Sequence, residues 1–362
     1  MASLPSTYKR WEASTFGGPN ALVLVERPLP APAAGDVLIR VLGTDATYTD
    51  IMVLTGHYVG VGASALPVTP GYALAGEVAA VGAGVSGFAP GDAVLAMPGL
   101  GCAAQYLAVP ARTAVKLDGA GAAFARARPE LAAAMALTGV TAYQMLHRVA
   151  GERLAAPGAA VLVHAAAGGT GAMLVQLAKL AGVAPGKIVG TCSTKNLDAV
   201  RALGVAAVSY EDAGWPAAAR AAAGVAGFAA VFDSVALQHH AAGVALLGAG
   251  GIYVAYGLTS KEDPGAVPLP AAVALFAQLT ARHLVLHSCF GAADAVFYNV
   301  KDRRDALPGE YAADARALVD LVASGKLEVV VGATHAFDGV KAALQAIAAG
   351  THRGKQCVRV TQ

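Results

Sequence analysis

Apolar and polar residues follow two different patterns along the chain, and the change falls near residue 120. Before that point, short apolar runs are separated by turns that contain glycine and proline, such as Gly82–Gly84 and Pro90–Asp92. Short strands between such breakers predict an antiparallel, barrel-like β unit. The runs are Ala21–Glu26, Val37–Leu42, Gly71–Val81 and Ala93–Met97.

Apolar strands then alternate with helical segments, after a first helical pattern over Pro129–Arg148. This alternation predicts βαβ units and a doubly wound parallel sheet of the Rossmann type. The predicted strands are Ala160–His164, Ile188–Thr191, Ala207–Tyr210, Ala229–Phe232 and Gly251–Ala255. The predicted helices are Gly171–Ala181, Asn196–Leu203, Trp215–Ala223 and Leu237–Leu247.

The tail mixes both kinds of element, and we expect it to complete the first β unit. Its predicted elements are helix Ala312–Ser324, extended run Glu328–Val331, helix Asp338–Ala349 and strand Gln356–Val360. The expected fold class is α/β. One β-rich domain comprises residues 1–128 plus 293–362, and the inserted Rossmann domain comprises residues 129–292.

Composition narrows the functional classes. Charged residues make up 14% of the chain, and Lys plus Arg minus Asp plus Glu is 26 − 24 = +2. Without a basic block, nucleic acid is not an expected partner. The uncharged stretches Val161–Ala178 and Ser234–Ser260 contain glycines and histidines, which favours buried elements over an integral membrane segment. The first residues lack an apolar signal region, so we expect a cytoplasmic location, with a short organellar transit peptide left open.

The four cysteines form no CxxC pair, no disulfide framework and no zinc-ribbon spacing. They are Cys102, Cys192, Cys289 and Cys357. This spacing is consistent with a reducing compartment.

The segment Val161–Gly171 carries the clearest functional signal. An apolar strand enters a glycine turn that opens a helix, and the turn reads Ala-x-x-Gly-Gly-x-Gly because Ala166 stands at the first glycine position. A pyrophosphate must approach backbone N–H groups at such a turn, where Cβ atoms would block it. The sequence therefore predicts a dinucleotide site. Its backbone contacts are expected at Gly168, Gly169, Thr170 and Gly171.

The end of the next predicted strand selects the nucleotide. NAD enzymes place an acid there to hold the ribose 2′-hydroxyl. Here Cys192 occupies that place, and Ser193, Thr194 and Lys195 follow it. Hydroxyls and an ammonium would bind a 2′-phosphate, so the expected cofactor is NADP(H). Ser193 and Thr194 also suit the N-cap of the following helix, and both roles can hold together.

Several further motifs occur in a fixed order along nearly the whole chain. They are Phe16–Asn20, Val37–Val41, Tyr48–Met52, Leu54–Tyr58, Thr69–Gly71, Gly76–Val78, Val81–Gly82, Pro90–Val94, Leu137–Tyr143 and Gly354–Lys355. With the glycine turn, they resemble the medium-chain dehydrogenase/reductase superfamily, in its zinc-independent quinone oxidoreductase and vesicle amine transport protein homologue branch. The resemblance implies a GroES-like catalytic domain built from both chain ends, an inserted Rossmann domain and a homodimer. It also implies hydride transfer from NADPH to a small hydrophobic quinone or enone.

Zinc-dependent members of the superfamily can be compared position by position. Their cysteine ligand corresponds to Thr47, and their Gly-His-Glu motif corresponds to Gly71-Tyr72-Ala73. Between Ala93 and Tyr106, where they carry a four-cysteine lobe, this chain has only Cys102. Because Thr47 and Tyr72 do not supply a tetrahedral zinc set, we expect no metal.

The resemblance also assigns cofactor contacts. Thr47 is matched with a hydrogen-bond donor to cofactor or substrate, Thr141 with the nicotinamide ribose and Tyr210 with the 2′-phosphate. The remaining matched positions are Ser234 at the end of the fourth strand, Tyr256 and Gly257 beside the nicotinamide, Cys289 and Phe290 in a loop over the ring, and Lys355 near the phosphates.

A reduction without zinc needs hydrogen-bond donors for the developing enolate or phenolate oxygen. The candidate catalytic residues are Tyr48 and Tyr58, with Thr47 beside them. Tyr58 matches the proton donor of enoyl-thioester reductase relatives, although either ring could simply line the cleft. We expect His164 to be structural, and the pair His239 and His240 to lie on a solvated helix face.

Three functions therefore remain open at this stage. The first is an NADPH-dependent quinone or enone reductase. The second is an enoyl-thioester reductase, for which Lys301, Arg303 and Arg304 are the only local basic cluster that could bind the thioester's phosphates. The third is a catalytically weak NADPH-binding protein.

Overall fold

The structure is a computed structural model that describes residues 4–58, 60–258, 269–287, 293–351 and 353–361. It divides into two compact units, one formed by residues 1–140 and 300–362 and the other by residues 141–299. The sequence predicted domain boundaries at 128/129 and 292/293. In the structure, residues 129–140 instead belong to the first unit and residues 293–299 to the second.

Packing explains both differences. Helix α3 (Pro129–Ala134) lies against strand β3 (Asp36–Ala46), since a Cβ added at Gly43 would meet the Glu130 nitrogen at 2.5 Å. Strand β13 (Asp294–Phe297) pairs in parallel with strand β12 (Leu247–Ala255) of the other unit's sheet.

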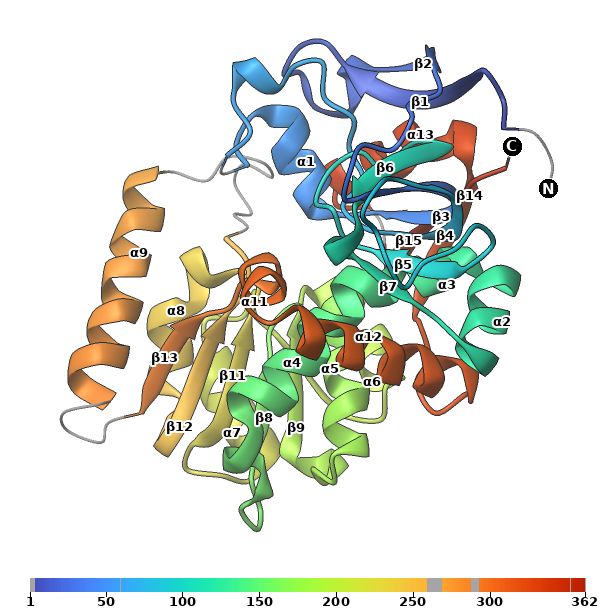
Figure 1. Cartoon of the computed structure of the whole chain (residues 1–362). Coiled ribbons are helices and arrows are strands. Elements are labelled where there is room, and N and C mark those ends of the chain that lie inside the picture. The colour runs from blue at the N-terminus through green and yellow to red at the C-terminus, as the bar shows by residue number, and fades with distance from the viewer. Residues whose placement is uncertain (1–3, 59, 259–268, 288–292, 352, 362) are drawn as a thin grey trace. The chain divides into compact units, whose positions relative to one another are not determined.

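The second unit contains a six-stranded parallel sheet (Figure 1). Its order is β10 (Ala206–Ser209), β9 (Ile188–Cys192), β8 (Val161–Val163), β11 (Phe228–Asp233), β12 and β13. The central strands are buried and almost wholly apolar, as expected for a parallel sheet covered on both faces. The doubly wound sheet predicted from the sequence is confirmed.

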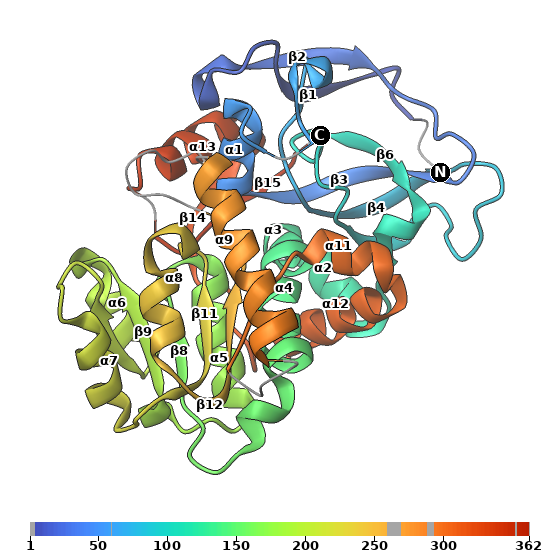
Figure 2. The ribbon, with the colours of Figure 1, turned by 90° about the vertical axis from the view of Figure 1, so that its left-hand side faces the viewer.

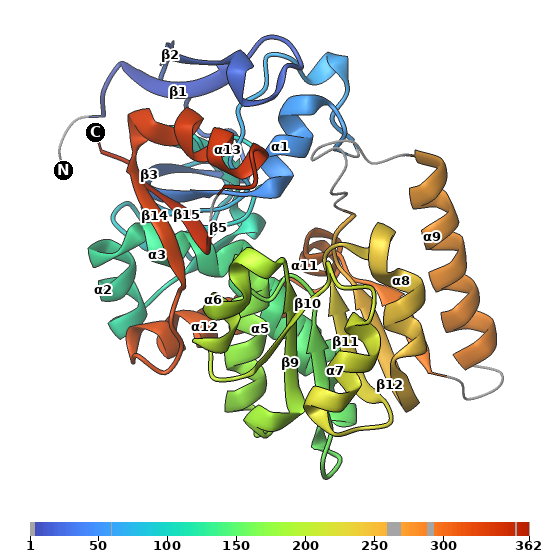
Figure 3. The same ribbon diagram turned by 180° about the vertical axis from the view of Figure 1, so that it is seen from behind.

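Helices cover this sheet on both faces. One face packs a shared core with helices α7 (Trp215–Ala223), α8 (Ala236–Ala245) and α9 (Leu269–Ala281). Gly190, whose neighbour Val189 belongs to that core, faces the other way, because a Cβ on it would lie 2.6 Å from the side chain of Val200. Val200 belongs to helix α6 (Leu197–Arg201), and helix α5 (Gly169–Leu180) lies beside α6 (Figure 3).

The helical stretch 129–150 is not a uniform α-helix. It contains α3, then a π-helical stretch Met135–Gly139, then α4 (Val140–Gln144), then a second π-helical stretch Met145–Ala150. Such π segments are uncommon and recur at functional sites.

The first unit holds a seven-stranded sheet in which most neighbours are antiparallel. Its path is β14 (Val331–Ala336), β15 (Lys355–Arg359), β3, β4 (Leu74–Val81), β5 (Ala93–Ala96) and β7 (Ala114–Lys116), with β6 (Tyr106–Pro110) also paired to β3. Strand β15 is antiparallel to β3, so the tail completes this sheet. A separate ribbon joins β1 (Thr7–Ala13) and β2 (Leu22–Pro28).

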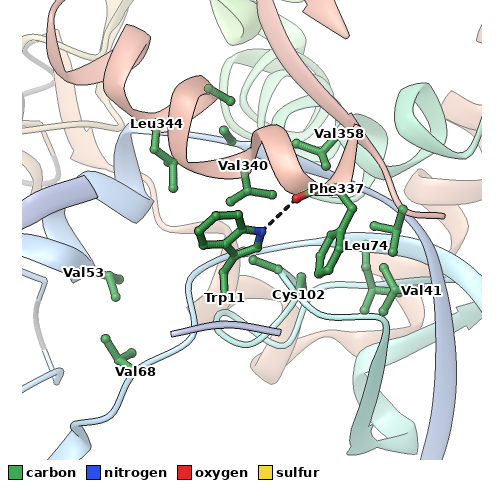
Figure 4. Packing of buried hydrophobic residues seen from close by; sticks show 14 of the residues in the cluster. Trp11, Val41, Val53, Val68, Leu74, Cys102, Phe337, Val340, Leu344 and Val358 are labelled. Atoms are coloured by element: carbon green, nitrogen blue, oxygen red, sulfur yellow. Dashed lines mark hydrogen bonds between the residues drawn. The ribbon is translucent and has the colours of Figure 1, made fainter. Parts of the chain in front are cut away.

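The core of the first unit gathers around Trp11 (Figure 4). Its indole Nε1 donates to the carbonyl oxygen of Phe337 at 2.8 Å, which satisfies the buried N–H. Helices α1 (Tyr48–Thr55) and α13 (Val340–Ala348) lie side by side and contribute to this cluster (Figure 2).

Some elements were not predicted from the sequence. These are β1, β6, β7, α1, α2 (Gly119–Ala127), α9, β13 and α11 (Val300–Ala306). Helix α12 (Pro308–Ala323) starts four residues before its predicted start, and β14 lies at 331–336, beyond the extended run predicted at 328–331. None of the described helices has the length and apolarity that a membrane crossing requires.

Candidate active site

The glycine turn closes tightly after β8. His164 N–H donates to the carbonyl of Phe232 and Ala166 N–H to that of Thr191, so both neighbouring strands hold the turn. Ala165 adopts φ of +52°, the only positive φ of a non-glycine residue in the described part of the chain. Such backbone strain tends to persist at functional sites.

The turn then packs against the helix that it opens. Gly168 N–H donates to the carbonyl oxygen of Ala165 at 2.9 Å, and Gly168 is the N-cap of α5. A Cβ on Gly171 would lie 2.7 Å from Cα of Ala166, so only glycine fits there. Gly169 and Thr170 form the first turn of α5, whose backbone N–H groups lack partners within the helix. This backbone is shaped to receive an anion.

The residues expected around a 2′-phosphate meet where β9 and β10 end. Ser209 lies opposite Cys192 in the pairing, and Tyr210 N–H donates to the carbonyl of Cys192 at 3.1 Å. Burial raises the pKa of Tyr210, although a hydrogen bond from Ser193 lowers it in part. The Thr194 and Ser209 hydroxyls are 2.8 Å apart. Lys195 follows and is exposed.

Burial raises the pKa of Cys192 to about 11, so the residue that the sequence places where NAD enzymes carry an acid is a neutral thiol. One feature of this region was not expected. Glu211, which follows the next strand, places a carboxylate here instead, because its Oε2 accepts the Thr194 N–H at 3.1 Å. The signal for it in the sequence was its position directly after Tyr210.

Ser234, Tyr256 and Gly257 come together at the ends of β11 and β12. Tyr256 N–H donates to the Asp233 carbonyl at 2.9 Å, and a Cβ on Gly257 would collide with the Ser234 backbone. Burial raises the pKa of Tyr256, and a hydrogen bond with Ser234 opposes that shift. Thr141 is buried on α4. The predicted contacts Cys289 and Phe290 lie outside the described residues.

The histidine pair does not lie on a solvated face, which corrects the sequence expectation. His239 packs 5.2 Å from His164 with nearly parallel rings, and His240 packs 5.2 Å from Tyr253. His164 itself is fully buried and shares a 2.7 Å hydrogen bond with Thr191 Oγ1. Burial lowers the pKa of His164, which keeps it neutral at neutral pH.

In the first unit, Thr47 and Asp50 form the start of α1. Thr47 donates to Asp50 Oδ2 through its N–H at 2.8 Å and its hydroxyl at 2.9 Å. Gly71 N–H donates to Asp50 Oδ1 at 2.7 Å. Burial nevertheless raises the pKa of Asp50 to about 6, above the ordinary value of 3.8.

Tyr58 and Tyr72, also in the first unit, form a hydrogen-bonded pair. The hydroxyls of Tyr58 and Tyr72 are 2.9 Å apart, and the rings meet edge to face at 6.1 Å. Tyr72 is buried, which raises its pKa and keeps it protonated, whereas Tyr58 is only partly buried. Tyr48, the first residue of α1, is also partly buried. The sequence offered Tyr72 only as a replaced zinc ligand.

Lys355 is engaged inside the first unit. Its ammonium forms an ion pair with Asp45 and donates to Thr138 Oγ1 at 3.1 Å, and its side chain is 6% exposed. Asp45 was not singled out from the sequence. A small cavity, with room for about one water, is lined by Asp45 and Asp50 among others.

The sequence matches two families. Residues 33–119 match the alcohol dehydrogenase GroES-like domain, and residues 203–358 match the zinc-binding dehydrogenase family. A probable quinone oxidoreductase of Schizosaccharomyces pombe is 31% identical over 261 residues, which cover 71% of this chain and 74% of the relative. The chain belongs to the quinone oxidoreductase and VAT-1 homologue branch of the medium-chain dehydrogenases/reductases.

Other relatives are matched over part of their length. The human synaptic vesicle membrane protein VAT-1 homolog-like is 33% identical over 51% of this chain and 41% of its own length. The PikAII component of the pikromycin polyketide synthase of Streptomyces venezuelae is 34% identical over 72% of this chain, which is 6% of that protein. The chain thus spans about half, or much less, of several curated relatives that it matches.

Solved structures of this branch share the fold. The quinone oxidoreductase of Pseudomonas syringae superposes with a TM-score of 0.76 at 25% identity, over 97% of this chain and 99% of that one. The Escherichia coli quinone oxidoreductase complexed with NADPH gives 0.78 at 24% identity, with the same coverage.

The name of the zinc-binding dehydrogenase family raises the question of whether this member's residues fit zinc. Among the described residues, no group of three His, Cys, Asp or Glu side chains could hold a metal ion. At the two ligand positions, the Thr47 hydroxyl donates to Asp50 and the Tyr72 hydroxyl is paired with Tyr58. Neither is a thiolate or imidazole, so this site does not fit a zinc ion.

The basic cluster considered for a thioester rim is paired within the first unit. Lys301 and Arg304 both form ion pairs with Asp305, at 3.0 and 2.6 Å, and Arg303 pairs with Glu310 at 2.7 Å. Arg304 is also buried. Each of these cations therefore already has an acidic partner, and two of them share one carboxylate.

Proposed function

We propose that this chain is an NADPH-dependent oxidoreductase that reduces quinones or α,β-unsaturated carbonyl compounds without zinc. The observation that carries the proposal is the strand, glycine turn and helix over 161–180, beside the polar group at the ends of β9 and β10. NADPH in the solved Escherichia coli relative supports the choice of cofactor.

The residues of the second unit fit such a cofactor. The turn Gly168–Gly171 has no room for a Cβ at its last position and would hold the pyrophosphate. Ser193, Thr194, Lys195 and Tyr210 would surround the 2′-phosphate with donors. Thr141, Ser234, Tyr256 and Gly257 would border the nicotinamide side. When bound, NADPH supplies the hydride.

Tyr58 and Tyr72 would serve the acceptor's oxygen. Charge develops on that oxygen as a quinone or enone accepts hydride, and a tyrosine hydroxyl can donate a hydrogen bond or a proton to it. Tyr58 is the more exposed residue of the pair. Tyr72 stays protonated and can donate to the Tyr58 oxygen once Tyr58 has released its proton. Tyr48 would be a further donor in the same unit.

The test is a fluorescence titration with NADPH and NADH, followed by a panel of quinones, enones and an enoyl-CoA, with a zinc chelator present throughout. Tight NADPH binding and chelator-resistant turnover of a quinone or enone are expected. Turnover abolished by chelator and restored by zinc would overturn the metal-free mechanism. NADPH binding without any turnover would instead support a binding role.

An enoyl-thioester reductase is the second candidate. The solved structure of the CurK enoyl reductase favours it, because that structure superposes with a TM-score of 0.75 over 99% of this chain, at 21% identity. The pairing of Lys301, Arg303 and Arg304 with acids disfavours it, since these cations would have to leave their partners to bind the thioester's phosphates. Preference for the enoyl-CoA in the panel would reverse the order.

A further inference from the structure

We propose that Glu211 is a specificity-determining residue that reduces the preference of this chain for NADPH over NADH. The inference rests on the proposed function, because it concerns the same nucleotide site. It begins from an acid placed among groups that otherwise suit a phosphate.

Hydrogen bonds hold both the backbone and the side chain of Glu211 in this place. Its own N–H donates to the Ser209 hydroxyl at 3.2 Å, and its carboxylate accepts the Thr194 N–H at 3.1 Å. The Ser209 hydroxyl is in turn 2.8 Å from the Thr194 hydroxyl. The three residues form one polar network across the ends of β9 and β10.

The charges around this network are mixed. Both Glu211 and Arg201 act electrostatically on Cys192, so both lie near the end of β9. Arg201 is already paired with Asp198 at 2.8 Å, and both side chains are exposed. Lys195 is the cation that directly follows Thr194. The site therefore places the Glu211 carboxylate on the Thr194 N–H, beside the hydroxyls of Thr194 and Ser209.

A 2′-phosphate and the Glu211 carboxylate compete for the same position. A phosphate monoester carries roughly −1.5 to −2 charge at pH 7. The Thr194 N–H can serve the phosphate only if Glu211 releases it. Two like charges sharing these donors repel each other, and the repulsion is only partly screened at an exposed site.

The ribose 2′-hydroxyl of NADH, unlike the 2′-phosphate of NADPH, is attracted to the Glu211 carboxylate. It can donate a hydrogen bond to a carboxylate, as it does to the acid at the second strand of NAD enzymes. Glu211 reaches a similar place from the third strand, while Cys192 remains a neutral thiol. The chain should therefore accept both nucleotides, with a smaller NADPH preference than Ser193, Thr194 and Lys195 alone would give.

The test compares Glu211→Gln with the wild type by titration with NADPH and NADH at low and high salt. Gln keeps an acceptor for the Thr194 N–H but removes the charge. We expect NADPH to bind about tenfold more tightly, which corresponds to about 1.4 kcal/mol, and NADH to change by less than about threefold. The gain should shrink at 0.5 M salt, because exposed charges are screened there.

The control is Asp212→Asn, the same loss of charge one residue along, where the carboxylate accepts the Gly214 N–H instead. It should leave the ratio of the two dissociation constants within twofold. Glu211→Lys should move the ratio further toward NADPH than Glu211→Gln.

An unchanged ratio in Glu211→Gln, or an equal shift in Asp212→Asn, would overturn the role of Glu211 and leave the proposed function standing. A wild type that binds neither nucleotide would overturn both.

Discussion

The buried pair of Lys355 and Asp45 gives a prediction that separates two roles for the lysine. Lys355 was expected near the cofactor phosphates, but its ammonium contacts Asp45 and Thr138. The Asp45 side chain is fully buried, and apart from this ion pair neither of its oxygens has a hydrogen-bond partner among the described residues. Removing the lysine alone would leave a buried carboxylate without compensation.

The magnitude follows from that geometry. Breaking a buried ion pair by removing one partner typically costs about 3–5 kcal/mol, because the remaining charge stays desolvated. We expect Lys355→Met to lower the free energy of unfolding of the first unit by about that amount. Adding Asp45→Asn removes the stranded charge, so the double variant should recover at least about 1–2 kcal/mol.

The assay can isolate the unit that carries the pair. The chain has two tryptophans, Trp11 in the first unit and Trp215 in the second. In a Trp215→Phe background, urea unfolding followed by fluorescence therefore reports on Trp11 alone. Titration with NADPH on the same samples measures the alternative role.

A cost below about 1 kcal/mol for Lys355→Met, or strict additivity with Asp45→Asn, would refute the structural assignment. Weakened NADPH binding at unchanged stability would instead support the role expected from the sequence, in which Lys355 contacts the cofactor phosphates. The expected result is the reverse, with lost stability and a dissociation constant within about threefold of the wild type in the folded protein.

Three further predictions concern the first unit. Tyr58→Phe should lower kcat for an enone by about a hundredfold or more with little change in KM, and Tyr72→Phe should lower it by about tenfold and move the alkaline limb of the kcat profile, as steady-state kinetics over pH can show. Because the pKa of Asp50 is raised from 3.8 to about 6, the folded state holds an extra proton between those values, so this residue should make the protein about 2 kcal/mol less stable as pH rises from 4 to 6. Urea unfolding in steps of pH should show this slope, and its absence would contradict the shift. Trp11→Phe should cost about 2–3 kcal/mol in urea unfolding, because it leaves the Phe337 carbonyl unpaired and a gap in the core, and a loss under 1 kcal/mol would refute that packing argument.

The parallel sheet was predictable because its buried strands read as continuous apolar runs bounded by turns. Helix α7 was predicted at its observed bounds, and β8 within a residue or so. Strand β1 was missed because Thr7–Ala13 mixes charged residues with Tyr8 and Trp11, which hides its alternation. The histidine pair on α8 was misjudged because polarity suggested solvent, whereas both rings pack inward against other aromatic rings.

The site residues also divide into those that the sequence could predict and those that it could not. The glycine turn is a local pattern, so the sequence located it. Glu211, Tyr72 and Asp45 gain their roles from partners 17, 14 and 310 residues away, and no local pattern encodes those pairings. Asp45 left one trace in the sequence, an acid inside the apolar strand that begins at 36.

The pairing of β15 with β3 bears on the order in which the chain can fold during synthesis. Gln356–Arg359 pair antiparallel with Gly43–Ala46, so more than 300 further residues must be synthesised before this edge of β3 meets its partner. The parallel sheet of the second unit lies wholly within residues 161–297 and can close before that partner leaves the ribosome. Until then β3 exposes an unpaired edge, which is the kind of surface that recruits other strands. Chaperone dependence and aggregation of nascent chains should therefore concentrate in the unit built from both ends of the sequence.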